Sequence, residues 1–378
     1  MSYLNICGFD TGDASEAFSV TGTTSIQNTT TYSGIGYALR CNPTTTATGW
    51  CALGSLPTSG AQTNGTSVGA QSWFTVHFLY NTKPASGDEI IFRFRDGSGN
   101  QKLEVRLNSS GKLAAYDSTT TLITTGSTVL ASGTWYALSS TCANGASASW
   151  EVRIGGVSEI SGTNNLGTNG SGSVNLGKSL NRNGNTVDFY YDDFAWSNSA
   201  YPPDGIARLL KPNANGANQS WSIGAGSGSH YQQVNEIPPD GDTTYLLSPL
   251  VTNDLETEQL QTGTSQSVSG TINTVKSCAD LKQNVTGGTA RVVLVSGATT
   301  DTTSADFTAG SSYALIQKMY DTDPNTGAAW TQAAIDKPLE TGGKNTSAVN
   351  QVRMTWTGAV VFYTPSVARE RTLTGVGV

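Results

Sequence analysis

The chain has 378 residues, a net charge of −7 at neutral pH and only 13% charged residues, against roughly 25% in typical soluble domains. The acidic balance without clustered lysines and arginines argues against a nucleic-acid partner, and no run reaches the about 18 apolar residues of a membrane span. The length is too great for one sandwich domain and fits two, so we expect two domains with neither nucleic acid nor membrane as partner.

The N-terminal segment Met1–Gly8 has neither the basic region nor the apolar core of a secretory signal, so we expect synthesis in the cytoplasm without a signal peptide. Five cysteines cannot all pair, and their spacing fits no Cys-x-x-Cys metal site. We expect buried, reduced thiols at Cys7, Cys41, Cys51, Cys142 and Cys278. A bridge between Cys41 and Cys51, which flank a turn-rich stretch, stays open.

Short runs of alternating apolar and polar residues, separated by glycine-rich turns, fill the first half of the chain. Phe74, Val76 and Phe78 share one face of such a run, because side chains two apart on a strand point the same way. The last run, Val187–Trp196, carries aromatic residues on both faces and is expected to be a central strand. These patterns predict a β-sandwich over residues 1–212.

A second domain is predicted over residues 219–378, after a boundary segment rich in Pro, Gly and Asn at Lys211–Asn218. Its strand-length runs are again rich in β-branched and aromatic residues, which predicts a second β-sandwich. One stretch differs, because alanines follow Thr331, a typical N-cap residue. We therefore expect a short helix near 330–338 in an otherwise all-β chain of two sandwiches.

Several motifs stand out along the chain. In the first half these are Gly8–Asp13, Tyr37–Arg40, and Tyr191–Ala195 followed by Tyr201-Pro202. In the second half these are Val234–Tyr245 and Asp323–Thr331. The first set resembles concanavalin-A-like (laminin-G-like) jelly-roll domains of bacteriophage virion proteins, and the second set looks like the companion domain of the same proteins. The resemblance implies a jelly-roll fold and a structural or adhesive protein on the virion exterior, with no active site to transfer.

The expected location and partners follow from this resemblance. The chain would be made in the host cytoplasm, reside on the virion and contact other virion proteins, either as a capsid decoration or head fibre or as a tail-associated protein. Polar and aromatic patches on an acidic chain suggest pairing with itself, so we expect a homo-oligomer such as a trimer. A tail-borne carbohydrate-binding protein for host-surface glycans is the alternative function.

Catalysis has little support in the sequence. Sandwich-fold glycoside hydrolases use paired carboxylates, and the nearest set here is Asp188, Asp192 and Asp193, for which we favour a polar strand end bonded to backbone amides. Of two histidines, His77 is expected on an outer or inter-subunit surface and His230 in a loop. We therefore expect no enzyme and no catalytic residues, while a depolymerase that depends on Asp192 stays open as a third alternative.

Calcium is the one metal for which the sequence offers a candidate. Asp321, Asp323 and Asn325 place oxygen atoms at alternate positions, as a hard-cation loop requires. However, Gln332 stands where a bidentate carboxylate is needed, so a turn before the helix is the simpler interpretation. No other cofactor is expected.

Tryptophans provide the remaining signal for ligand binding, because sugars stack on aromatic faces. Trp73, Trp135, Trp150 and Trp356 lie in strand patterns and are expected in the core. Trp50 and Trp196 lie near turns, so we select them, together with Asp192, as candidate ligand-binding residues.

Overall fold

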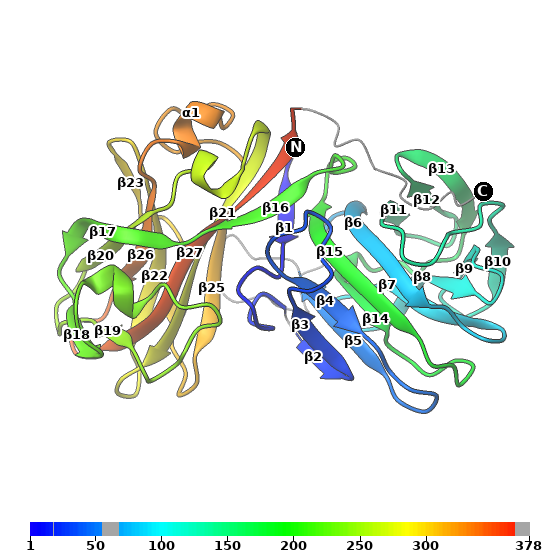
Figure 1. The fold of residues 1–378 in the computed structure, drawn as a ribbon, viewed down its shortest axis with the longest axis horizontal. Helices are drawn as coiled ribbons and strands as arrows, with labels where there is room; N and C mark the ends of the chain where they lie inside the picture. Colours follow the sequence, from blue (N-terminus) through cyan, green and yellow to red (C-terminus); the bar gives the residue numbers. More distant parts are fainter. Residues whose placement is uncertain (18, 55–67, 367–378) are drawn as a thin grey trace.

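In the computed structural model, which describes residues 1–17, 19–54 and 68–366, the strands form four antiparallel sheets (Figure 1). Two sheets face each other in the first sandwich and two in the second, and the two sandwiches lie side by side. The prediction of an all-β chain of two sandwiches is confirmed. None of the helices in the described part of the chain is both long and apolar enough to cross a membrane.

The first sandwich consists of sheet 1 and sheet 2. In spatial order, sheet 1 contains β13 (Val157–Asn164), β12 (Ala148–Ile154), β11 (Tyr136–Ala143), β6 (Gln71–Thr82), β15 (Asp188–Ser197), β4 (Ala38–Cys41) and β3 (Thr24–Gln27), with β1 (Tyr3–Cys7) also paired to β15. Sheet 2 contains β10 (Leu122–Thr125), β9 (Leu113–Tyr116), β8 (Gln101–Asn108), β7 (Asp88–Asp96), β14 (Ser171–Lys178), β5 (Gly49–Gly54) and β2 (Ser19–Gly22).

Aromatic residues from both sheets fill the core of this sandwich. Phe74 of β6 packs edge-on against Phe92 of β7, with 4.9 Å between ring centroids, because alternate residues of each strand face the other sheet. Trp150 and Trp196 belong to the same core, and the central position predicted for the last strand is confirmed, since β15 lies between β6 and β4. All five cysteines are buried with free thiols.

The second sandwich consists of sheet 3 and sheet 4. Sheet 3 contains β18 (Ser222–Ala225), β19 (Tyr245–Leu247), β27 (Val352–Pro365), β21 (Gly270–Gln283) and β25 (Ala314–Tyr320), with β16 (Ile206–Leu210) paired to β27. Sheet 4 contains β17 (Pro212–Gln219), β20 (Leu255–Leu260), β26 (Glu340–Asn345), β22 (Thr289–Ser296) and β23 (Thr299–Asp301), with β24 (Phe307–Thr308) paired to β22. Short helical segments are η1 (His230–Gln233), η2 (Thr264–Gln266) and α1 (Gln332–Ile335).

The predicted short helix is confirmed at α1. Thr331 is its N-cap, and the Thr331 side-chain oxygen accepts a hydrogen bond from the Ala334 backbone N–H at 3.2 Å. This bond satisfies one of the donors that a helix start leaves unpaired.

The change from the first sandwich to the second lies earlier in the chain than predicted. Ile206–Leu210, expected to end the first domain, pairs as β16 with β27 of the second sandwich. The segment expected as a linker, Lys211–Asn218, instead contributes most of β17, which pairs with β20. Pro, Gly and Asn are tolerated there because β17 is an edge strand, where an absent N–H leaves no partner unpaired.

The two sandwiches share a buried interface. Ile6 of β1 packs with Leu209, Trp356 and Phe362 in one apolar cluster. The Lys276 Nζ donates to the Ile6 carbonyl oxygen at 2.5 Å and lies 3.2 Å from Glu16 Oε1, and both charged side chains are fully buried. This interface makes the two sandwiches one packed unit.

Candidate functional site

An open groove of about 490 Å³ crosses the outer face of sheet 1. The groove follows from the strand register, because residues directly opposite each other form a straight row across four strands. Trp73 of β6 lies opposite Thr141 of β11, Thr141 lies opposite Glu151 of β12, and Glu151 lies opposite Ser161 of β13. The next residues along β6 and β12 are Phe74 and Trp150, which face the core, so the row itself faces outward.

Two aromatic side chains border the groove. Trp73 is partly exposed, and its indole N–H has no hydrogen-bond partner among the described residues. The Tyr201 ring lies under the Arg153 guanidinium, 4.0 Å from its central carbon, and the Tyr201 hydroxyl donates to Glu151 Oε2 at 2.9 Å. Trp73 is thus open to a ligand, whereas Tyr201 is held in place by its neighbours.

Glu151 is the acidic group of the groove. The Arg153 Nη2 lies 2.8 Å from Glu151 Oε2, so the two form a partly exposed ion pair without net charge. Burial opposes ionisation of Glu151, but hydrogen bonds from Arg153, Ser158 and Tyr201 outweigh it and lower the pKa of this carboxyl. The carboxylate is therefore ionised and neutralised at neutral pH.

Neutral hydroxyls complete the lining. The side chains of Ser149, Ser161 and Thr163 are exposed and make no hydrogen bond within the described residues. An apolar ring face next to free donors and acceptors is the combination that a ligand with C–H faces and hydroxyl edges requires.

The candidate ligand-binding residues do not form one site, and none of the three lines this groove. Trp196 is fully buried in the core, so the prediction that it binds a ligand is wrong; β15 is central and covered by sheet 2 on that face. Trp50 is partly buried on β5 of the other sheet. Asp192 is 3% exposed and accepts hydrogen bonds from the backbone N–H groups of Tyr32 and Asp193, both at 2.9 Å, so the predicted bonding to backbone amides is confirmed. The predicted position at a strand end is wrong, because Asp192 lies in the middle of β15.

Trp73 was missed because its strand pattern predicts burial. Its position was nevertheless readable, since it alternates out of phase with Phe74 and Val76, which form the core face. A tryptophan on a strand faces the core or the solvent according to its phase in the alternation, so strand position alone does not predict its burial.

His77 lies inside the molecule, not on an outer surface as predicted. It is fully buried, with Nδ1 3.0 Å from Asp193 Oδ2 and Nε2 2.7 Å from Asp204 Oδ1, and its ring stacks on Tyr32 at 3.4 Å. Although sheet 1 has an outer face there, the segments around Tyr32 and Asp204 cover it. Burial opposes the charged form, yet the hydrogen bonds to Asp193 and Asp204 raise the pKa of His77.

The oxygen atoms of the candidate calcium residues bind protein donors. Asp321 accepts from the Tyr3 backbone N–H and the Thr274 hydroxyl. Asp323 is 4% exposed and accepts from the Ser296 hydroxyl at 2.7 Å.

Further bonds at this loop are those of a turn. Asp323 also accepts from the Asn325 backbone N–H, and the Asn325 side-chain oxygen accepts from the Ala298 backbone N–H at 3.3 Å. Asp321 and Asp323 thus bond to different strands. Calcium binding here stays a prediction, and the hydrogen bonds of the loop are those of a turn.

A different cluster of potential ligand atoms lies in the second sandwich. One nitrogen of His230 and one carboxylate oxygen each of Glu256 and Glu258 lie within 4.8 Å of one another. Burial raises the pKa of both carboxyls, and the charge of Glu256 raises that of Glu258 further. The only local signal for this cluster is the pair of glutamates at alternate positions of one strand, because His230 lies on a separate segment.

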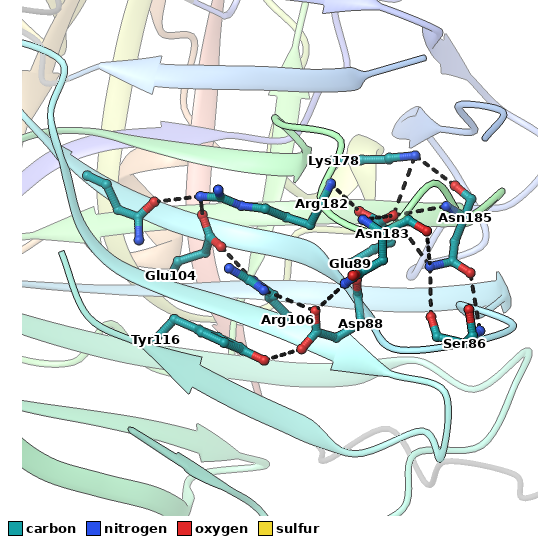
Figure 2. A network of polar contacts seen from close by, with 11 residues as sticks. Ser86, Asp88, Glu89, Glu104, Arg106, Tyr116, Lys178, Arg182, Asn183 and Asn185 are labelled. Atoms are coloured by element: carbon teal, nitrogen blue, oxygen red, sulfur yellow. Dashed lines mark hydrogen bonds and ion pairs between the residues drawn. The ribbon is translucent and has the colours of Figure 1, made fainter. Parts of the chain in front are cut away.

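The described residues also contain an extended polar network over sheet 2 (Figure 2). Arg106 lies between Asp88 at 3.0 Å and Glu104 at 2.6 Å, and the Tyr116 hydroxyl donates to Asp88. Arg182 joins Glu104 at 3.0 Å. These charges neutralise one another, which indicates that the network holds strands β7, β8 and β9 together.

The same network fastens a loop to the end of the sandwich. Asn183 and Asn185 donate backbone N–H groups to Glu89 Oε1, at 3.2 and 3.0 Å, and Lys178 lies 3.6 Å from the same oxygen (Figure 2). Lys178 and Glu89 are fully buried, so this part of the network is closed to solvent.

Comparison with known proteins gives a likeness of fold only. No family model matches the chain, and no curated protein matches it. Among solved structures, the cellulose-induced protein Cip1 is 12% identical with a TM-score of 0.40, covering 52% of this chain and 98% of its own. An endo-β-1,4-glucuronan lyase from the fungus Trichoderma reesei is 13% identical with a TM-score of 0.39, covering 52% and 95%. The alginate lyase AlgAT5, of polysaccharide lyase family 7, is 11% identical with a TM-score of 0.31, covering 42% and 77%.

One prediction is corrected by these structures. The expectation that the chain is not an enzyme was inferred from a sandwich fold with few titratable groups. Two of the similar structures, the glucuronan lyase and the alginate lyase, are enzymes, so a β-sandwich of this kind is no argument against catalysis.

Proposed function

We propose that this chain binds a carbohydrate in the groove on the outer face of sheet 1. The observation that carries the proposal is the partly exposed Trp73 ring beside the hydroxyls of Ser149, Ser161 and Thr163, whose side chains, like the Trp73 indole N–H, have no hydrogen-bond partner in the part of the chain that the structure describes. A pyranose ring presents C–H groups on its face and hydroxyls around its edge. The groove offers a matching surface for both, with aromatic contact below and neutral hydrogen-bonding groups at the sides.

The groove favours an uncharged glycan. Among the described residues that line the groove, Glu151 has the one carboxylate, and it is already paired with Arg153. This lining therefore offers no unpaired charge that would select a charged sugar. The volume of about 490 Å³ falls within the range of small-ligand sites, roughly 300–1,000 Å³, and matches a short oligosaccharide. Because the groove is open along the sheet, a longer chain can continue beyond it.

Binding to an array of neutral and acidic glycans tests this proposal, with wild type compared with Trp73→Ala and Trp50→Ala. We expect wild type to bind a neutral glycan and Trp73→Ala to bind it at least about tenfold more weakly, equivalent to about 1.4 kcal/mol. Trp50→Ala is the matched control, since Trp50 is also a partly buried tryptophan on a strand but lies in sheet 2.

Two results would refute the proposal. One is undiminished binding by Trp73→Ala when the variant is folded. The other is equal loss in both variants, which would mean that the tryptophan substitutions act through stability rather than through contact.

The resemblance to bacteriophage virion proteins gives this binding a biological setting. In that setting the chain is a homo-oligomer on the virion exterior, carried on the tail, and the glycan belongs to the host surface. The setting rests on the sequence motifs alone. Gold-labelled antibodies against the chain, viewed on purified particles, would place it on capsid or tail. An absence of label on all particles would refute the virion location, but it would not affect the proposal that the groove binds a glycan.

A further inference from the structure

Two glutamates point into the second sandwich where apolar residues belong. Glu256, Glu258 and Leu260 are alternate residues of β20 and so share a face, and Leu260 is part of the apolar core. Opposite Glu258 in β26 lies Thr341, whose hydroxyl contacts the Thr357 hydroxyl of sheet 3 across the interior. Both carboxyls are fully buried, and burial of an ionised group is costly unless it is paired.

Among the described residues, no lysine or arginine pairs with these two carboxyl groups. In the described part of the chain, neither Glu256 nor Glu258 forms an ion pair with such a residue. Glu256 Oε2 accepts from the Trp221 backbone N–H at 2.7 Å, and Gln219 Nε2 lies 3.5 Å from Glu258 Oε1. The second oxygen of Glu258, Oε2, accepts no hydrogen bond from the described residues.

A histidine completes the cluster from the solvent side. His230 is the first residue of η1, and its Nδ1 lies 2.6 Å from Glu256 Oε1. The turn before it is fixed by Gly228, which has φ of +97° and where a Cβ would come within 2.4 Å of the Gln232 side chain. The His230 side chain is 20% exposed, so one side of the cluster is open to entry from solvent.

We propose that His230, Glu256 and Glu258 bind a divalent transition-metal ion of the zinc type. One imidazole nitrogen and two carboxylate oxygens form a ligand set that zinc accepts, and nitrogen ligation disfavours calcium and magnesium. Ligand atoms around a tetrahedral zinc ion lie about 3.4 Å apart, and the three atoms here already lie within 4.8 Å of one another. Three protein ligands leave a fourth position for water or another ligand.

The ion would supply the positive charge that this part of the core lacks. It would also explain why two acidic side chains occupy core positions and why Glu258 Oε2 has no donor. The competing explanation is that protons alone neutralise the carboxyls. The proposal is independent of the groove on sheet 1, which belongs to the other sandwich.

Zinc chloride titrated into chelator-treated, full-length protein distinguishes the two explanations, with heat measured by calorimetry and the melting temperature recorded with and without zinc. Wild type should take up one equivalent of zinc and melt at a higher temperature in its presence. Glu258→Gln should bind more than about tenfold more weakly, because loss of even a supporting partner costs about 10–100-fold.

Glu340→Gln is the matched control. Glu340 lies on the neighbouring strand β26 and loses the same charge, but its side chain bonds Thr257 and the Ala217 backbone N–H rather than the cluster. It should bind zinc like wild type. His230→Gln, at a partly exposed position, repeats the test should Glu258→Gln fail to fold.

Failure of folded wild type to take up zinc or to gain thermal stability would overturn the proposal in favour of protonated carboxyls. Equal zinc affinity in wild type, Glu258→Gln and His230→Gln would overturn it as well, because the ion would then bind elsewhere.

Discussion

At the scale of single residues, His77 shows how burial changes what a side chain does. It is held between the carboxylates of Asp193 and Asp204 with its ring against Tyr32, and each ring nitrogen has a partner. An exposed histidine would titrate near the ordinary pKa of its imidazole, about 6.5. Here the two carboxylates outweigh burial and favour the imidazolium, so the charge state of one residue is tied to folding.

The stabilisation that His77 provides should depend on pH. Because its pKa is raised in the folded chain, this contribution is complete below the unfolded pKa of about 6.5 and is lost as pH rises through the folded pKa. His77→Gln should therefore lower the free energy of unfolding by about 1–3 kcal/mol at pH 5.5, and by less at pH 9. Urea unfolding of both proteins at the two pH values measures this; a difference that stays constant or grows with pH would contradict it.

The sequence predicts which strand residues face the core but not what covers the opposite face. Alternation placed Phe74, Val76 and Phe78 correctly. It could not place His77, because the covering residues Tyr32 and Asp204 come from segments 45 and 127 positions away along the chain. For Trp73 the local alternation was sufficient, because this residue lies out of phase with the core-facing residues of β6.

At the scale of secondary-structure elements, buried ion pairs connect neighbouring strands and stabilise their packing in addition to the apolar core. Arg106 of β8 bridges Asp88 of β7 and Glu104 of its own strand, and all three are nearly inaccessible to solvent (Figure 2). A buried ion pair contributes little net stability to the fold, but removal of one partner leaves the other charge buried and unpaired, which is strongly destabilising.

Arg106→Met should therefore lower the free energy of unfolding by about 3–5 kcal/mol, the range for breaking a buried ion pair. Arg291→Met removes the same group from a partly exposed pair with Asp306 and should cost no more than about 1 kcal/mol. Chemical denaturation of both variants gives the comparison. Similar losses in the two would mean that the network in Figure 2 does not stabilise sheet 2 in the way described.

Element boundaries were predictable only where local chemistry is unambiguous. Thr331 marks the start of α1 because an N-cap bond is local. Residues 211–218, rich in Pro, Gly and Asn, looked like a linker, yet most of them form an edge strand, since pairing on one side only tolerates such residues. Whether such a segment pairs depends on β20, more than thirty residues further along the chain.

At the scale of the whole molecule, the two sandwiches are joined by a buried ion pair. Lys276 of β21 and Glu16 of the first sandwich lie 3.2 Å apart, both without solvent exposure. The Lys276 ammonium also bonds the Ile6 carbonyl, so a single side chain links β1 to the second sandwich.

Lys276→Met should lower the free energy of unfolding by about 3–5 kcal/mol, because Glu16 would keep a buried charge without its partner. Lys276→Met combined with Glu16→Gln should recover a large part of that loss. A double-mutant cycle by chemical denaturation measures the coupling. Additive effects of the two substitutions would show that the pair does not hold the sandwiches together.

The sequence indicated two sandwiches but neither candidate site. The groove depends on the register of β6, β11, β12 and β13, which places Trp73, Thr141, Glu151 and Ser161 in one row. The cluster in the second sandwich brings His230 to two residues more than twenty positions later in the chain. The groove thus depends on the pairing of four strands, and the cluster depends on η1 lying beside β20, so both sites form from contacts between separate segments of the chain.

The most direct test of the account is the position of a bound glycan in a crystal structure of this chain. Crystals soaked with the neutral oligosaccharide that binds best on the array should show a sugar ring against Trp73, with hydroxyls near Ser149, Ser161 or Thr163. A sugar bound over sheet 2, at the junction of the two sandwiches or beside Trp50, with the groove free of ligand, would contradict it.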